Sequence, residues 1–81
     1  MTETIWENTL DQRYKCTVTR NSQYLGQLKI LDEELNKVLC DEEVKLSYGA
    51  TFGPDVDDVR DWEDRIIQIV DGVSNPGETG K

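Results

Sequence analysis

The amino-acid sequence predicts a small α+β domain: an antiparallel meander of three or four strands packed on one face against a C-terminal helix. Three segments between residues 13 and 48 alternate apolar and polar side chains, which is the period of a half-buried strand. From about residue 54 the apolar positions instead step by three and four, the period of an amphipathic helix. Short polar joins between the strand segments favour antiparallel neighbours.

The first twelve residues carry three apolar anchors, Ile5, Trp6 and Leu10. Extending the alternation backwards from Tyr14 would give one long first strand, and a short separate strand ending at "TLDQ" fits equally well. We expect the short strand, placed at an edge of the sheet.

The next two segments have clearer strand patterns. "RYKCTVTR" (13–20) places Tyr14, Cys16 and Val18 on one face. After the turn "NSQ", the segment "YLGQLKIL" (24–31) places Tyr24, Leu28 and Ile30 on one face. Gly26 in its middle indicates a bulge or a close backbone approach.

The last strand segment, "KVLCDEEVKLSY" (37–48), follows the polar turn "DEELN". It puts apolar side chains at even positions, with an interruption at Glu42 that indicates a bend or a sheet edge. The even-numbered apolar residues are Val38, Cys40, Val44, Leu46 and Tyr48.

A helix is predicted over residues 54–71. Pro54 suits its first turn and Asp55 suits a capping position, while Asp71-Gly72 suits its end. The side chains expected against the sheet are Val59, Trp62, Ile66, Ile69, Val70 and Val73. Residues 1–73 then form a single domain, and 74–81, "SNPGETGK", form a loose tail.

An acidic stripe lies opposite the apolar face of this helix. It contains Asp57, Asp61, Asp64 and Asp71, and we interpret it first as the solvated face. Asp55, Asp57 and Asp58 also fall near the helix start, where the macrodipole favours negative charge. Asp61 and Arg65 have the i, i+4 spacing of a helical ion pair.

The sequence is poor in groups for metal binding or catalysis. An EF-hand loop counted from Asp55 would place Val59, Arg60 and Ile66 at its fifth, sixth and twelfth positions, which does not fit. The chain has no histidine, so the commonest general base is missing, and no nucleotide-binding or metalloprotease motif is present. We therefore expect no cofactor, no metal and no enzymatic activity.

Charge is distributed unevenly along the 81 residues. The net charge is −8, with +1 in residues 1–31 and −9 in residues 32–81. Such a field repels phosphate backbones, so direct nucleic-acid binding is disfavoured, and it attracts a basic protein surface. An acidic mimic of DNA is an alternative that the −9 leaves open.

Cysteine usage indicates a reducing compartment. Cys16 and Cys40 form no CxxC motif and fall on the apolar side of strand segments, so we expect buried free thiols.

No apolar run approaches the length of about 20 residues that a membrane helix needs, and no signal-peptide pattern opens the chain. A cytoplasmic protein without membrane contact is expected.

Three aromatic residues are candidates for partner binding. Trp62 has core spacing, whereas Trp6 lies near a terminus, where an exposed aromatic anchor for a partner is an alternative to core packing. Tyr48 and Phe52 flank the Gly-rich corner "SYGATFGPD", which is either a plain strand-to-helix connection or a ligand-contacting loop.

Three stretches together resemble small uncharacterised proteins carried by bacteriophages of mycobacteria and related actinobacteria. They are Trp6–Asp11, Tyr14–Arg20 and Leu46–Trp62, roughly half of the chain. The resemblance implies a viral accessory protein made inside a bacterium and acting on a host protein, and it transfers no catalytic or binding residue.

The function that we predict is a small acidic, non-enzymatic protein-binding module, a phage accessory factor that acts on a host protein with a basic surface. Its candidate contact residues are Trp6, Asp57, Asp61, Asp64, Tyr48 and Phe52. The alternative is a structural or assembly protein that forms homo-oligomers or part of a virion through an open sheet edge.

Overall fold

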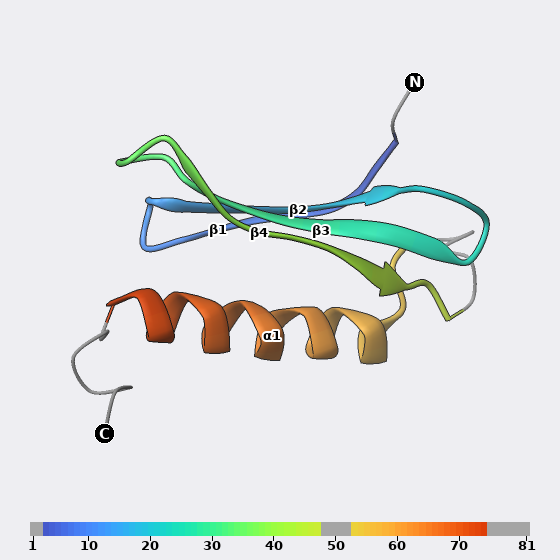
Figure 1. Cartoon of the computed structure of the whole chain (residues 1–81). Coiled ribbons are helices and arrows are strands. Elements are labelled where there is room, and N and C mark those ends of the chain that lie inside the picture. Colours follow the sequence, from blue (N-terminus) through green and yellow to red (C-terminus); the bar gives the residue numbers. More distant parts are fainter. Residues whose placement is uncertain (1–2, 48–52, 75–81) are drawn as a thin grey trace.

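A four-stranded antiparallel sheet with one helix on its face forms the structure (Figure 1). The computed structural model describes residues 3–47 and 53–74. The strands follow one another in the order β1-β2-β3-β4, so the predicted α+β meander is confirmed. The elements are β1 (Thr4–Leu10), β2 (Tyr14–Arg20), β3 (Leu25–Asp32), β4 (Lys37–Lys45) and α1 (Val56–Ser74).

Strand β1 is a separate edge strand, as predicted, and pairs with β2. The chain reverses at Asp11 and Gln12, which have φ angles of 55° and 54°. The Arg13 N–H closes this turn on the Leu10 carbonyl at 3.0 Å. Two successive left-handed residues give the backbone twist that a tight hairpin needs.

Strand β3 packs against β2 at Gly26, as the close-approach interpretation predicted. A Cβ atom at this position would lie 2.8 Å from the Thr19 carbonyl oxygen and 3.2 Å from a Val18 methyl group. Tyr24 precedes β3, which begins at Leu25, and its carbonyl accepts the Leu46 N–H at 2.8 Å. Its side chain is 54% exposed, so it does not join Leu28 in the core.

Strand β4 contains a bulge that the alternation did not reveal. Ile30 pairs with Cys40, whereas Leu31 pairs with Val38, so Leu39 is the extra residue. The extra residue switches the face of the strand, and Val38 is 45% exposed instead of facing the core with Cys40. Glu42 continues the strand on the edge of the sheet and pairs with Leu28.

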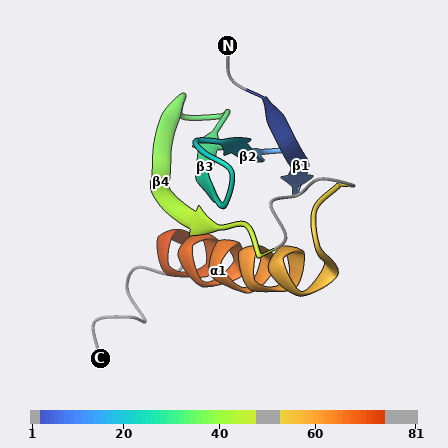
Figure 2. The same ribbon diagram turned by 90° about the vertical axis from the view of Figure 1, so that its right-hand side faces the viewer.

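Helix α1 covers one face of the sheet, with β1 and β4 on opposite sides above it (Figure 2). Trp62 and Ile66 are buried against side chains of the sheet, and Val59, Ile69 and Val70 pack at the margin of this cluster. Val73 is 40% exposed. The sheet residues of the core are Tyr14, Cys16, Val18, Leu28, Ile30, Cys40 and Leu46.

The helix is shifted toward the C-terminus relative to the predicted 54–71. Asp55 caps it as expected, because its carboxylate accepts the Asp57 N–H at 3.1 Å, but Pro54 lies before the first turn. The prediction that Gly72 ends the helix is wrong. The helix continues to Ser74 because Gly72 keeps a negative φ. Residues 75–81 of the predicted tail lie outside the described residues.

One buried carboxylate fixes the end of the sheet. Asp32 accepts two hydrogen bonds from the Arg13 guanidinium, at 2.9 and 2.8 Å, and further ones from the backbone N–H groups of Glu34 and Leu35. Its side chain has no exposed surface, and the Arg13 hydrogen bonds hold the pKa of Asp32 below its usual range. This cluster ties the first hairpin to the turn between β3 and β4.

Alanine substitutions at two glycines should have opposite effects. Gly26→Ala should lower the free energy of unfolding by about 1–3 kcal/mol, because the new methyl group meets backbone and packed side chains. Gly72→Ala should raise it by about 0.5–1 kcal/mol, since the helix position is open and alanine is the better helix former. Urea unfolding of both variants measures the difference, and equal effects would contradict the described packing.

Asp32 should contribute stability in a pH-dependent way. Its folded-state pKa is lowered, so the contribution is complete above the unfolded-state value of about 3.9 and is lost as pH falls through the folded-state pKa. Asp32→Asn should therefore lower the urea midpoint at pH 7, and its difference from the natural protein should shrink below about pH 4. A difference that is as large at pH 3 as at pH 7 would refute the pairing with Arg13.

Candidate functional site

The outer face of α1 carries the predicted acidic stripe. Asp57, Asp61, Asp64 and Asp71 are all exposed, because Trp62 and Ile66 occupy the opposite side of the helix. From Asp57 to Asp71 the stripe extends for about 21 Å along the helix axis at 1.5 Å per residue.

Arg65 does not pair with Asp61, contrary to the i, i+4 prediction. Its guanidinium reaches across to β4 and donates to the two Glu42 carboxylate oxygens at 2.8 and 3.3 Å. This pairing holds the pKa of Glu42 below its usual value. The physical reason is that Glu42 faces the helix from the sheet and requires a cation, whereas Asp61 is solvated.

Ion pairs are concentrated on the sheet. The cations Arg13, Lys15 and Arg20 each pair with a carboxylate of the sheet or its turns. Arg65 of α1 also pairs with a sheet carboxylate, that of Glu42. Within residues 3–47 and 53–74, the carboxylates of Asp57, Asp61 and Asp64 have no cation within ion-pair distance.

The open face of the sheet, by contrast, is balanced in charge. Strand pairing and the burial of Cys16 and Val18 place the odd-numbered side chains of β2 and their partners on this face. Its charged residues are the acids Glu7, Asp41 and Glu43 and the bases Lys15, Lys29 and Lys45. The excess negative charge of the described residues therefore lies mainly on α1.

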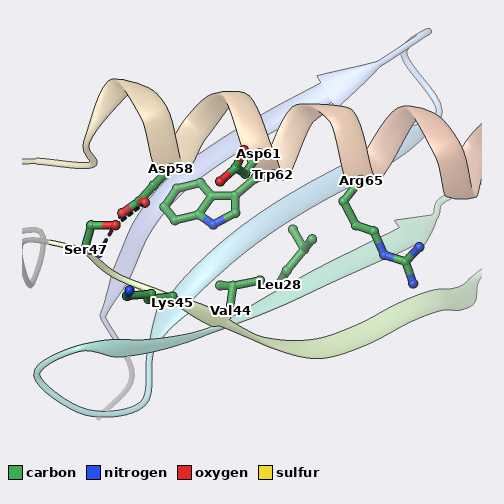
Figure 3. A pocket seen from close by; sticks show the side chains of 8 residues that line it. All are labelled: Leu28, Val44, Lys45, Ser47, Asp58, Asp61, Trp62 and Arg65. Atoms are coloured by element: carbon green, nitrogen blue, oxygen red, sulfur yellow. Dashed lines mark hydrogen bonds between the residues drawn. The ribbon is translucent and has the colours of Figure 1, made fainter.

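A cleft of about 320 Å³ lies between α1 and the end of β4 (Figure 3). Leu28, Val44 and Trp62 form its apolar part. The polar lining residues are Lys45, Ser47, Asp58, Asp61 and Arg65.

Asp58 is the residue of this cleft that sequence reasoning missed. It is only 7% exposed, and its carboxylate accepts the Ser47 hydroxyl at 2.6 Å and the Ser47 backbone N–H at 2.8 Å. Its position in the sequence could have indicated this burial, because Asp58 lies one helical turn before the core residue Trp62 and therefore on the same face. Asp57 and Asp61 lie farther around the helix. The bond joins the end of the sheet to the first turn of α1.

The cleft has limited chemical capability. The Ser47 hydroxyl and the Asp58 carboxylate are engaged with each other, and Arg65 is engaged with Glu42. Asp61 and Lys45 remain as opposite charges at its rim. The cleft can hold a side chain with an apolar body, but it has no excess charge with which to select one.

Trp6 lies on the other side of the helix, in contact with the core. Its ring is partly buried and stands 5.8 Å from that of Trp62, centroid to centroid, at 54°. It lines a small hollow of about 50 Å³ between β1 and α1. Trp6 is thus not part of the outer acidic stripe, although Glu63 of the helix lines the same hollow.

Tyr48 and Phe52 lie outside the described residues. Cys16 and Cys40 are free and buried, as predicted, and burial raises the pKa of Cys16 to about 11, which keeps its thiol protonated and unreactive at neutral pH. The described residues contain no group of three potential metal ligands. They also contain no helix with the length and apolar character needed to cross a membrane.

Comparison with known proteins identifies no relative: no family model, no curated protein and no solved structure matches the chain.

Removing the Asp58–Ser47 connection should destabilise the fold. Asp58→Ala should lower the free energy of unfolding by about 1–3 kcal/mol and Ser47→Ala by about 0.5–1.5 kcal/mol, because each leaves a hydrogen-bonding group without its partner. The exposed control, Asp64→Ala, should stay within about 0.5 kcal/mol. A double-mutant cycle of Asp58 and Ser47 measures their coupling, and strictly additive effects would contradict the interaction.

Proposed function

We propose that this protein is a non-enzymatic binding module that engages a basic surface of a partner protein through the outer face of α1. One observation carries the proposal: Asp57, Asp61 and Asp64 are exposed together and have no described cation as partner. Bringing a basic surface to these carboxylates requires no existing ion pair of the described chain to break.

The balance of charge elsewhere supports the helix as the binding face. The open sheet face carries equal numbers of acids and bases, so it offers little attraction for a charged partner. The stripe on α1 is a row of four carboxylates, with the exposed Arg60 beside it, on a helix whose opposite side is packed in the core. Such a row steers the encounter with a basic surface and accelerates association.

The proposed setting is a phage-infected bacterium. The resemblance of three stretches to actinobacteriophage proteins supports a host protein as partner and the bacterial cytoplasm as the location. Two protonated, unpaired thiols are compatible with a reducing compartment.

Matched charge variants test the proposal by capture of partners from mycobacterial lysate. Asp61→Asn/Asp64→Asn removes two carboxylates from the helix, and Glu33→Gln/Glu43→Gln removes two exposed carboxylates from the sheet and its turn. The helix variant should bind the captured partner about 2- to 30-fold more weakly, at about 0.2–1 kcal/mol for each exposed charge. The sheet variant should bind like the natural protein.

Salt provides the second arm of this test. Exposed charges are screened over about 10 Å at 0.1 M salt and about 3 Å at 1 M, so the captured partner should be released as salt rises. Equal capture by both variants, or capture that does not depend on salt, would refute recognition through the acidic helix.

A further inference from the structure

The two edges of the sheet differ in how they are protected. Strand β4 carries five charged side chains, Lys37, Asp41, Glu42, Glu43 and Lys45, together with the bulge at Leu39. Charges and bulges are the common means by which natural edges resist a further strand. Strand β1 has one charged side chain, Glu7. Its own irregularity lies at its beginning, between Thr4 and Trp6, and its register is regular from Trp6 to Leu10. Strand β1 is therefore the more open edge for another strand.

A hollow lies beside this open edge, on the helix side of the sheet. It has a volume of about 50 Å³ and is mostly apolar, with the aromatic ring of Trp6 and the side chains of Leu10 and Ile66 in its lining. Ile67 of α1 also lines it and is 57% exposed. An aliphatic side chain placed here would cover part of Ile67 and replace water in contact with apolar surface.

The charges around the edge specify the occupant. Glu63 lies at the hollow, and Glu7 lies on β1, with its only described cation, Lys15, at a distance of 3.8 Å. A second copy of the chain would bring its own Glu7 and Glu63 to the same edge, and like charges that face each other are destabilising. A basic segment would instead meet Glu63 on the helix side of the edge and Glu7 on the open face of the sheet.

We propose that β1 is a docking edge, at which an extended basic segment of the partner adds as a fifth strand. One aliphatic side chain of this segment fills the hollow, and a lysine or arginine two residues away lies near Glu63, since alternate side chains of a strand point to the same face. The proposal depends on the proposed function and specifies how the partner is held once the acidic helix has attracted it.

A synthetic peptide tests the edge directly. The probe is Thr-Lys-Thr-Leu-Thr-Lys-Thr, which presents lysine, leucine and lysine on one face when extended. Titrated into the ¹⁵N-labelled full chain at low salt, it should shift the amide signals of Thr4–Leu10 and of the α1 residues around Ile67, and leave those of β4 in place. A second peptide with proline at the two threonines beside leucine lacks two backbone donors and should not produce these shifts.

Matched variants separate the hollow from general hydrophobicity. Ile67→Gln should weaken binding of the probe about fivefold, because the leucine loses an apolar neighbour, whereas Val38→Gln, an exposed apolar residue on β4, should change it less than twofold. Equal binding of the two variants, equal binding of the proline peptide, or shifts on β4 would overturn the docking edge.

The same titration distinguishes this proposal from the proposed function. Shifts confined to the outer face of α1 would overturn strand addition and leave recognition by the acidic helix intact. An absence of any shift would overturn strand addition, while the capture experiment with the two charge variants decides the proposed function. A β1-mediated homodimer, seen by size measurement of the free chain, would overturn the assignment of this edge to a partner.

Discussion

The packing of Trp62 and Ile66 against the sheet is the contact on which the other features of this molecule depend. Both side chains are buried against residues of β2, β3 and β4, and they fix the rotation of α1 about its own axis. Once that rotation is fixed, the positions of the other helix residues follow. Asp57, Asp61 and Asp64 face water, Arg65 faces Glu42 on β4, and Glu63 and Ile67 face the side of β1. A rotation of the helix by one residue would redistribute all of these groups.

The same contact explains how a chain with a net charge of −8 keeps a stable core. Four acids of the sheet and its turns are neutralised locally, Asp32 and Glu34 by Arg13, Glu3 by Arg20 and Glu42 by Arg65. The helix acids lie at the outermost surface, where water screens their mutual repulsion. The result is a molecule with one balanced face and one acidic face, an asymmetry that net charge alone does not reveal.

Periodicity in the sequence was sufficient for the elements but not for the contacts between them. The alternation in β2 and the spacing of three and four in α1 are local patterns, and both were predicted because each arises from burial of one side of one element. The bulge at Leu39 depends on how β4 aligns with β3, and the Glu42–Arg65 and Asp58–Ser47 contacts join residues 23 and 11 positions apart. No single-element pattern contains that information, so Arg65 was assigned to its helical neighbour Asp61 and Asp58 was not singled out. Trp6 could be singled out from the sequence as a large aromatic residue, but its contact with Trp62 depends on the placement of β1.

The Trp6–Trp62 pair gives the two proposed binding features a common physical basis. Trp62 positions the helix and therefore the acidic stripe, and Trp6 belongs to the edge strand that borders the hollow. Because the two rings touch, an edge strand that frays would remove a neighbour from the central helix residue, and a strand added to β1 would hold that neighbour in place. Aromatic contacts of this kind contribute about 0.5–1.5 kcal/mol beyond the effect of the area they bury. This is a large part of the free energy of unfolding of a domain of this size. The placement of both tryptophans in one contact therefore links the stability of the exposed edge to the orientation of the acidic face, so that a partner held at the edge as proposed would also stabilise the acidic face.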